Sequence, residues 1–457
     1  MNKTVIIIML LLPFQFIFAR DGILKKYIED GLNNNLALKQ KEFSLKKSML
    51  ELREARGKFL PTISIEGRYS RAGGGRTIEF PVGDLMNPVY DAINATRVGS
   101  GQAPFNFPVL ENEVIPFLRE EEQETKVRVT QMVFQPALYY NQKIKTDLKS
   151  IREFDVNIYK RQLIAEIKKA YLNYLKLEQV KKLYSSTLNL LNENLRVNEK
   201  LVENGKATKE VIYRAQSEIS KIEQELEEAK ANSTQAQYYF NHLLNRPLQD
   251  LIESEENLSL LEPADEDPDA FIQSMLKNRE ELKQIRETIK VAKDAGGAAG
   301  SAFFPGIFVV GDYGYQGEKY DFTPENDYWM VSGILQWNLF NGFQDHSKHQ
   351  QAKVDERKAD LVLKETEQLL TMQVQKAYDN LQVAAKGRIT SEERLRAARE
   401  SFKIINKKYG EGLVPQIEFM DAHNTLTSAE INKIINQYDY YIRAVELERI
   451  AGLYIFE

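Results

Sequence analysis

Few residues of this sequence have both the type and the spacing that catalysis or metal binding requires. Glu418 and Asp421 are two carboxylates three residues apart, so on a helix they share one face. Such a pair could act as a general acid and a general base, but no nucleophile or pocket accompanies it in the sequence. The pair alone is typical of a solvated helix face, and it does not predict an enzyme.

The histidines and cysteines also argue against catalytic or metal chemistry. His346 and His349 stand three apart near the start of a predicted helix, as two metal ligands could, but no carboxylate or cysteine matches them. We interpret them as surface residues. His242 and His423 are isolated. The chain has no cysteine, which excludes disulfides, thiolate metal sites and a lipid-modified N-terminal cysteine. We expect no catalytic, cofactor-binding or metal site.

The start of the chain is typical of a secretory signal. Lys3 precedes an apolar run from Val5 to Phe18, and Ala19 ends a possible cleavage site. The run is too short to favour a single membrane anchor, so we assign residues 1–19 to a signal peptide. With 457 residues and a net charge of −5, nothing indicates a nucleic-acid partner.

Two long helical stretches carry the same pattern, 207 residues apart. In each, every third and fourth residue belongs to a stripe that resembles a coiled-coil seam. The first stripe contains Leu163, Ile167, Ala170, Tyr174, Leu177, Lys181, Tyr184, Leu188, Leu191, Leu195, Asn198 and Val202. The second contains Leu370, Val374, Ala377, Leu381, Ala384, Arg388, Ser391, Leu395, Ala398, Phe402, Ile405 and Tyr409. Both stripes are interrupted by a base and followed by a glycine, Gly205 or Gly412, so we infer a duplication.

The bases that interrupt the stripes, Lys181 and Arg388, have two possible environments. They could face water inside a helical tube or pair with acidic side chains. The sequence does not choose between them.

Two stretches, about 59–71 and 124–135, alternate with a period of two, which predicts strands. A membrane strand needs this pattern, with apolar residues toward lipid and polar residues toward a wet lumen. The expected lipid-facing residues are Ile63, Ile65, Tyr69, Val127, Val129 and Val133. The expected lumen-facing residues are Ser64, Glu66, Arg68, Lys126 and Arg128.

The stretch between these strands, residues 72–122, is rich in glycine and proline and is predicted to be a loop. A loop this long would be unusual inside a compact core. On the external side of a membrane protein built from strands, long loops are expected.

The chain therefore divides into two repeats, 20–246 and 269–457, joined by an acidic, proline-containing connector at 247–268. The first repeat contains predicted helices at 136–204 and 208–245. The second contains strands at about 303–315 and 327–339, then helices at 344–409 and 416–453. The last strand alternates poorly, so neither of its faces is assigned to lipid.

Four strands cannot close into a barrel, because about eight is the practical minimum. Either the strands pair across subunits or they are not membrane strands. Three copies of the chain would supply twelve.

Several segments of the sequence resemble one known protein family. Phe59-Leu60-Pro61-Thr62-Ile63 and Phe303-Phe304-Pro305-Gly306-Ile307, the duplicated long helices and the segment from Gly412 to Asp421 resemble the TolC family of outer-membrane efflux proteins. The resemblance covers essentially the whole mature chain. It implies a membrane α+β fold in a homotrimer, with a 12-stranded transmembrane β-barrel continued by a periplasmic helical barrel.

The resemblance also implies a gate. The family's narrowest ring matches Glu418 and Asp421, and threefold symmetry would bring six carboxylates near the axis, where they would favour cations. Tyr409 matches a family tyrosine near the turn. The first repeat has Val211 and Arg214 at the acidic positions, so one repeat alone would supply the ring.

The helix turns are, by the same resemblance, where the hairpin tips of a periplasmic adaptor would dock. Val414 stands where a family member has an arginine that helps latch the closed state, so this chain lacks that residue. The expected docking residues are Asn204, Gly205, Lys206, Gly410, Gly412, Leu413 and Val414.

The resemblance therefore predicts an exit duct in the outer membrane, part of a tripartite efflux or type I secretion system. Its partners would be a periplasmic adaptor, an inner-membrane RND or ABC exporter and outer-membrane lipid, and conduction would be passive. The alternative is a periplasmic coiled-coil adaptor or scaffold with no channel of its own. A secreted helical enzyme would need catalytic groups that the sequence does not show.

Overall fold

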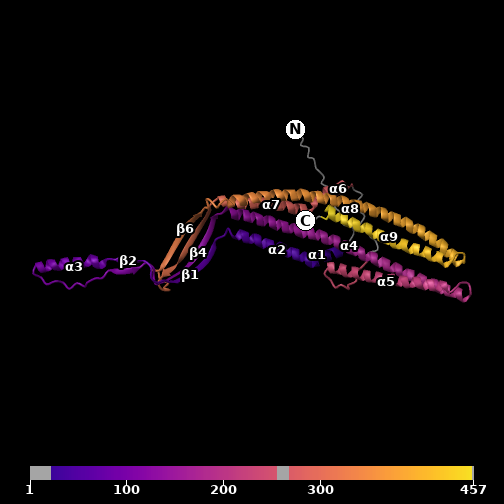
Figure 1. The fold of residues 1–457 in the computed structure, drawn as a ribbon, viewed down its shortest axis with the longest axis horizontal. Helices are drawn as coiled ribbons and strands as arrows, with labels where there is room; N and C mark the ends of the chain where they lie inside the picture. The colour runs from indigo at the N-terminus through magenta and orange to yellow at the C-terminus, as the bar shows by residue number, and fades with distance from the viewer. Residues whose placement is uncertain (1–21, 255–266, 455–457) are drawn as a thin grey trace, which may run out of the picture. The chain divides into compact units, whose positions relative to one another are not determined.

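The computed structural model describes residues 22–254 and 267–454, which form two compact units (Figure 1). The predicted signal peptide, 1–19, and positions 255–266 of the predicted connector lie outside the described residues. One unit is helical and contains the chain up to residue 51, 144–293 and the part from 353 onward. The other unit contains the strands and covers 52–143 and 294–352.

Eight α-helices lie wholly or partly in the helical unit, and α2, α4, α7 and α8 continue along the chain into the other unit. The helices are α1 (Ile23–Asn34), α2 (Leu36–Gly57), α4 (Pro136–Glu203), α5 (Glu210–Leu243), α6 (Pro268–Asn278), α7 (Glu280–Gly300), α8 (Gln344–Gly410) and α9 (Gln416–Ala451).

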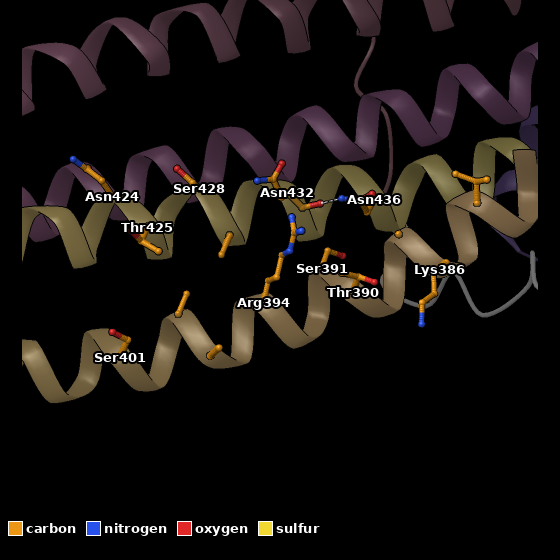
Figure 2. A pocket seen from close by; sticks show the side chains of 15 residues that line it. Lys386, Thr390, Ser391, Arg394, Ser401, Asn424, Thr425, Ser428, Asn432 and Asn436 are labelled. Atoms are coloured by element: carbon orange, nitrogen blue, oxygen red, sulfur yellow. Dashed lines mark hydrogen bonds between the residues drawn. The ribbon is translucent and has the colours of Figure 1, made fainter.

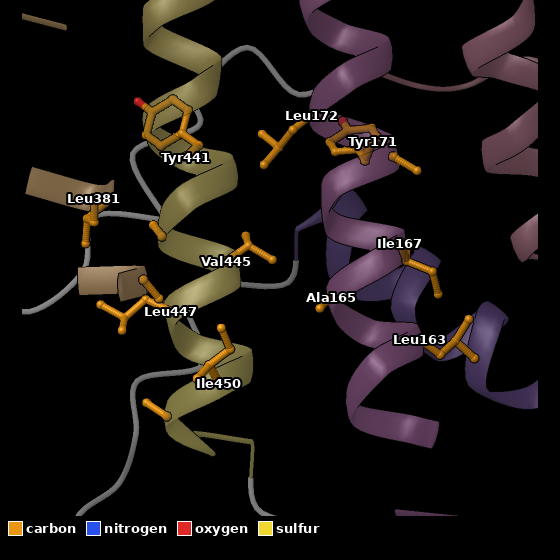
Figure 3. Close-up of a cluster of buried hydrophobic side chains, with 14 of the residues drawn as sticks. Leu163, Ala165, Ile167, Tyr171, Leu172, Leu381, Tyr441, Val445, Leu447 and Ile450 are labelled. Atoms are coloured by element: carbon orange, nitrogen blue, oxygen red, sulfur yellow. The ribbon is translucent and has the colours of Figure 1, made fainter. Parts of the chain in front are cut away.

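The core of the helical unit is built from the two predicted stripes. Leu163 and Ile167 of α4 are fully buried, and Val374 of α8 is too. Figure 3 shows part of this core, where side chains of α4 face those of α9. Val445 and Leu447 of α9 contribute to the same cluster. The 3–4 spacing therefore does mark the buried side of both long helices.

The two bases that interrupt the stripes have different environments. The Lys181 ammonium lies 2.5 Å from a carboxylate oxygen of Glu178, one turn earlier on α4. The Arg388 guanidinium lies over the ring of Tyr440 on α9, 4.5 Å from its centroid. Lys181 therefore pairs with an acidic side chain, which is one of the two environments predicted for it. Arg388 instead makes a cation–π contact, which was not predicted.

The helical stretch from residue 23 to 57 is divided into two helices. Asn35 separates α1 from α2 because its side chain bonds to other backbone groups. Its Oδ1 accepts a hydrogen bond from the Leu38 amide at 3.0 Å, as an N-cap does, and its Nδ2 donates to the Leu243 carbonyl at 2.9 Å.

The sheet unit contains one four-stranded antiparallel sheet in the order β1-β4-β5-β6. Its strands are β1 (Thr62–Arg71), β4 (Glu121–Phe134), β5 (Gly306–Gly317) and β6 (Asp327–Gln336), and a 3-10 turn, η2 (Ser301–Phe303), precedes β5. The central pair, β4 and β5, joins the two repeats. A register shift between Met132 and Phe134 leaves Val133 at a bulge.

The prediction of a loop at 72–122 is wrong, because this stretch contains two strands and a helix. Strands β2 (Thr77–Phe80) and β3 (Glu113–Pro116) pair with each other, and helix α3 (Val82–Gly99) lies between them in the chain. The glycines, asparagines and Pro88 of α3 have the composition of a loop, which is why the sequence did not predict this helix. Residues 72–120 are called the arm below.

A buried ion pair connects the two repeats within the helical unit. Arg161 of α4 and Glu280 at the start of α7 are 2% and 4% exposed, and their charged atoms are 2.6 Å apart. The Arg161 guanidinium also donates to the Tyr454 carbonyl at 2.9 Å. Burial raises the pKa of Glu280, and the nearby Arg161 only partly offsets this. Each of these two buried charges is therefore stabilised by the presence of the other.

Glu280→Ala should reduce the free energy of unfolding by about 3–5 kcal/mol, because it leaves the Arg161 cation buried without its counter-ion. The measurement is thermal unfolding of the detergent-extracted protein. Arg161→Met with Glu280→Leu is the control and should lose much less, since it removes both charges and keeps the volume. Equal losses in the two variants would contradict this account.

Candidate channel surfaces and helix tips

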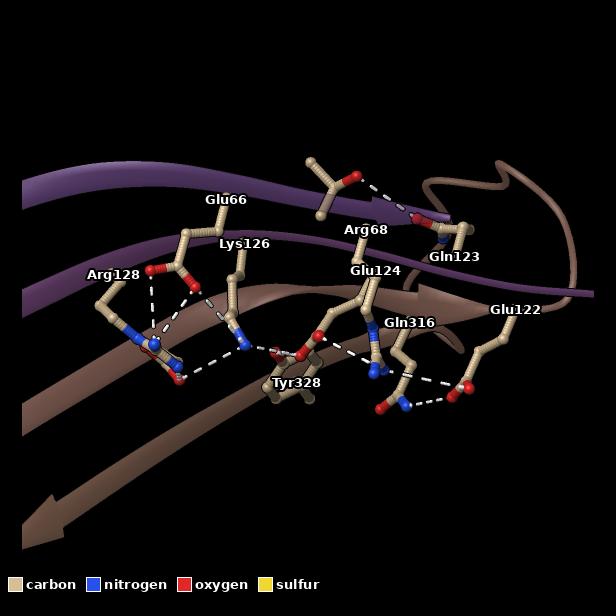
Figure 4. Close-up of polar contacts among 11 residues, drawn as sticks. Glu66, Arg68, Glu122, Gln123, Glu124, Lys126, Arg128, Gln316 and Tyr328 are labelled. Atoms are coloured by element: carbon tan, nitrogen blue, oxygen red, sulfur yellow. Dashed lines mark hydrogen bonds and ion pairs between the residues drawn. The ribbon is translucent and has the colours of Figure 1, made fainter. Parts of the chain in front are cut away.

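One face of the four-stranded sheet carries a network of charged and polar side chains that extends across all four strands (Figure 4). Arg128 of β4 donates two hydrogen bonds of 2.8 Å to Asp312 of β5 and pairs with Glu66 of β1 at 3.2 Å. Although Asp312 is only 3% exposed, this bidentate contact satisfies its charge.

The network continues toward the other end of the strands. Lys126 pairs with Glu124 at 2.9 Å, Tyr328 of β6 donates to Glu124 at 2.6 Å, and Arg68 lies 3.6 Å from the same carboxylate. The predicted lumen-facing residues thus share one face, since Ser64 stands opposite Arg128 in the register. The sequence analysis missed Asp312 and Tyr328, which only strand pairing brings to this face.

The opposite face of the sheet is apolar and exposed. Ile63 pairs with Val129 and Ile65 with Val127, and the two isoleucines are 72% and 78% exposed. Tyr69 and Val133 are also exposed. Five of the six predicted lipid-facing residues therefore lie on this face, whereas Val133 is exposed at the bulge, where no pairing fixes its face.

The register also assigns the fourth strand, which the sequence left open. Trp329 and Val331 of β6 pair with Tyr313 and Gly311 of β5, which in turn pair with Val127 and Val129. Trp329, Val331 and Leu335 therefore lie on the apolar face, where all three are exposed. Alternation alone missed them because Met330 and Ile334 make the other face of β6 apolar too.

The turns that end α4 and α8 have the same backbone structure. After α4, the Lys206 amide donates to the Leu201 carbonyl at 2.8 Å; after α8, the Leu413 amide donates to the Lys408 carbonyl at 2.9 Å. Gly205 and Gly412 occupy the left-handed region, with φ of 68° and 74°. Both turns are Schellman motifs, so the duplication extends to their hydrogen bonds.

The predicted docking residues lie at these two turns, and most of them are exposed. Val414 is half-buried. The Asn204 side chain donates to the Lys200 carbonyl at 2.7 Å and so completes the turn after α4.

Tyr409 does not point freely into solvent but connects the two long helices. Its hydroxyl donates a 2.6 Å hydrogen bond to Asn198 of α4, and Asn198 donates to Asn194 at 2.9 Å. Its ring stacks on Phe419 at 4.8 Å. Burial raises the pKa of Tyr409, so the phenol is neutral at physiological pH. Asn198 belongs to the predicted stripe of α4, whereas Asn194 was not identified from the sequence.

His423, which the sequence analysis left as isolated, is part of an aromatic cluster at the same tip. Its ring lies 5.7 Å from that of Phe402 and 6.3 Å from that of Phe419. Only 3% of His423 is exposed, and burial lowers its pKa. The cluster holds the start of α9 against the end of α8.

Glu418 and Asp421 project away from this cluster. Both are exposed, and within the described residues neither belongs to an ion pair. Gln416 of the same turn donates to the Val211 carbonyl at 2.9 Å, so the two returning helices begin side by side. The start of α9 therefore lies beside Val211, the position of the first repeat that corresponds to Glu418.

A groove of about 1100 Å³ lies between α8 and α9, along a stretch of the two helices near the turn that joins them (Figure 2). It is lined mainly by small or uncharged polar side chains, among them Gly387, Ser391, Ser428 and Asn432. Lys386 and Arg394 are its only charged lining residues. The two helices are therefore loosely packed along this stretch.

No helix within 22–254 or 267–454 is long and apolar enough to cross a membrane.

The described residues also contain no group of three or more His, Asp or Glu side chains that could hold a metal ion. A ring nitrogen of His349 lies 3.1 Å from the Gly296 carbonyl oxygen.

Comparison with known proteins gives one family and one fold. Residues 271–453 match the family described as outer membrane efflux protein. Among solved structures, a membrane protein from Pseudomonas aeruginosa has a TM-score of 0.77 at 18% identity, covering 94% of each chain. CusC has a TM-score of 0.76 at 16% identity, covering 95% of this chain and 93% of its own.

The open-state MtrE channel of Neisseria gonorrhoeae has a TM-score of 0.75 at 17% identity, covering 94% of this chain and 88% of its own. No curated protein matches the chain in sequence. The match to residues 271–453, within the second predicted repeat, is to the same family that the sequence resembles. The solved structures confirm the fold class of long helices with a four-stranded sheet in each copy.

Gly412→Ala should lower the stability of the α8–α9 hairpin by about 1 kcal/mol, because alanine is disfavoured at positive φ. No heavy atom lies within 4 Å of the added Cβ, so the backbone conformation alone is tested. The measurement is hydrogen exchange of the last turn of α8.

Gly410→Ala is the matched control, because Gly410 ends α8 without a positive φ and also has open space around it. This variant should not destabilise the hairpin. Equal exchange rates in both variants would show that the left-handed residue is not required at this turn.

Proposed function

We propose that the chain is an outer-membrane efflux channel without enzymatic activity, and that it is the exit duct of a tripartite efflux or type I secretion system. Three copies would form one duct, since channels of this family are trimeric. Substrates would pass through it without chemical change, delivered by an inner-membrane RND or ABC exporter through a periplasmic adaptor. The four-stranded sheet, with one charged and one apolar face, is the observation that carries this proposal.

The sheet needs other copies because its two edge strands each have one unpaired side within the described chain. All neighbouring strands are antiparallel, so β1 and β6 run in opposite directions. The β6 strand of one copy can therefore pair with β1 of the next in the same antiparallel way. Three copies close such a ring with twelve strands, and closure satisfies every edge.

The two faces of the sheet support the orientation of this ring. The exposed apolar face, with Ile63, Ile65 and Trp329, fits contact with lipid. The charged network around Arg128 and Asp312 fits a wet lumen, where water solvates its outer members. The reverse orientation would place this network in lipid at a large energetic cost.

The helix tips are proposed as the periplasmic entrance. Glu418 and Asp421 are exposed and free of ion pairs in the described chain, so three copies could present six carboxylates near one axis. Tyr409 would act differently from these acids, because its bond to Asn198 holds α8 against α4. The two Schellman turns are proposed as the docking sites for the adaptor.

Opening is proposed to change the coiling of α8 and α9 when the adaptor engages. The groove between these helices supports this, because small and polar side chains such as Ser391 and Asn432 lose little when they separate. A tightly interdigitated apolar contact would resist the same movement.

The alternative, a periplasmic adaptor or scaffold without a channel, does not explain why one face of this sheet is apolar and exposed. A soluble scaffold would expose Ile65, Trp329 and Leu335 to water on one continuous surface. Such a surface needs either lipid or a partner.

Imaging of detergent-extracted particles tests the assembly directly. We expect a threefold particle in which a single micelle surrounds the joined sheets, because the apolar faces need lipid or detergent. Extraction from the membrane fraction should require detergent. A monodisperse monomer that washes off membranes in high salt would contradict the proposal.

Replacing Glu418 and Asp421 together with alanine should reduce the cation preference of the reconstituted channel and change its conductance, since it removes six carboxylates from the proposed constriction. The measurement is single-channel current in planar bilayers under a salt gradient.

Glu223→Ala with Glu227→Ala is the control, because it removes two exposed carboxylates of α5 that are not proposed to line the constriction. This control should keep the original selectivity. If the Glu418 and Asp421 variant also keeps it, the two acids do not form the narrowest ring.

A further inference from the structure

Helix α3 of the arm has two sides of different chemistry, and one of them is bonded to another segment of the same chain. Asn87 makes two hydrogen bonds to the backbone of Leu110, at 2.8 and 2.9 Å. Asn94, seven residues later, makes the same pair with Phe105, at 3.0 and 2.7 Å. The two asparagine side chains therefore fasten the extended segment 102–112 along one side of the helix.

Other contacts on the same side complete this attachment. The Tyr90 ring stacks on Phe107 at 4.3 Å, and Arg97 lies over the Phe105 ring and donates to the Ala103 carbonyl at 3.0 Å. Gly83 allows the close approach of the backbone, since a Cβ there would meet the Leu110 carbonyl oxygen at 2.3 Å. The arm is thus a defined structure and not a loose loop.

The other side of α3 is apolar and exposed. Leu85, Val89, Ala92 and Thr96 recur at spacings of four, three and four, which is the spacing of a helix seam. Leu85 is 64% exposed and Val89 is 48% exposed, and no described residue covers them. At about 100° per residue, Asn87 and Asn94 lie about 140–160° around the helix from Val89. The seam is therefore separate from the attachment side.

This seam also borders a shallow hollow of about 530 Å³. It is lined by Val89, Ala92, Ile93 and Thr96, with Pro88 and Arg97 at its sides. A hollow with these walls can receive apolar side chains from a second helix.

We propose that the α3 seams of neighbouring copies of this chain pack against each other, so that the arms of a trimer join in a helical bundle. The inference rests on the proposed trimer. The arm connects β1 to β4, so closure of the sheet would bring three arms to the same end of the assembly. A threefold axis would then present three identical seams to one another.

The charges of α3 favour a second copy over a lipid surface. A helix that lies on a membrane normally carries many Lys and Arg residues on its polar side. Between residues 82 and 99, α3 has two acids, Asp84 and Asp91, and one base, Arg97, which already contacts Phe105. Both acids lie about 140–160° from Val89, so packed seams would not bring like charges together.

Disulfide trapping tests the proposal with little background, because the chain has no cysteine. Val89→Cys places a single thiol in the exposed seam, where it leaves the attachment side unchanged. Under mild oxidation of the detergent-extracted protein we expect disulfide-linked dimers in up to about two-thirds of the chains, since the third thiol of a trimer has no partner.

Asp91→Cys is the matched control, because it places an exposed thiol on the other side of the same helix. It should give few dimers and should react freely with a bulky maleimide, whereas the Val89→Cys thiol should react slowly. Equal dimer formation at the two positions would overturn the proposal, because it would mean that the arms collide without a preferred face.

Imaging the same samples separates the two inferences. If particles are threefold but Val89→Cys gives no dimers, the α3 proposal fails and the channel proposal stands. Protection of Val89→Cys from maleimide without any dimer would mean that lipid or another partner covers the seam, which also overturns the α3 proposal. The absence of threefold particles would contradict the proposed trimer itself.

Discussion

Unpaired backbone groups at the two edges of a four-stranded sheet are the constraint on which the rest of this protein depends. An edge strand exposes a row of donors and acceptors, and here the strands between the edges are apolar on one face and charged on the other. A single copy cannot satisfy both edges and cover the apolar face. In the proposed trimer, repetition of the same antiparallel pairing would satisfy the edges, and lipid would cover the apolar face.

Duplication supplies the helical framework, and divergence between the repeats supplies the candidate function. Both long helices end in the same hydrogen-bonded turn around Gly205 or Gly412. The side chains that follow differ, because Val211 and Arg214 of the first repeat stand where the second has Glu418 and Asp421. The backbone conformation constrains the turn in both repeats, while solvent-exposed positions on the returning helices are free to acquire different charges.

Sequence patterns predicted the two long helices and the first hairpin, and they missed helix α3. The 3–4 stripes predicted the buried side of α4 and α8, since core burial imposes that spacing. Helix α3 was missed because it makes few apolar contacts with the chain and is held by asparagine side chains, which resemble loop composition. At the candidate gate, the exposed acids could be named in advance, but the bond of Tyr409 to Asn198 could not, because the two residues are 211 positions apart in the chain.

The sequence alone determined the period of the two long helices, the duplication and the two-faced character of the first hairpin, because local spacing reflects the geometry of one helix or strand. Tertiary structure decided which residues become neighbours. The apolar face of β6 became identifiable only through its register with β5, because Met330 and Ile334 make both sides of that strand apolar. Asp312 acquires its partner Arg128 in the same way, since strand pairing joins positions that are 184 residues apart in the chain.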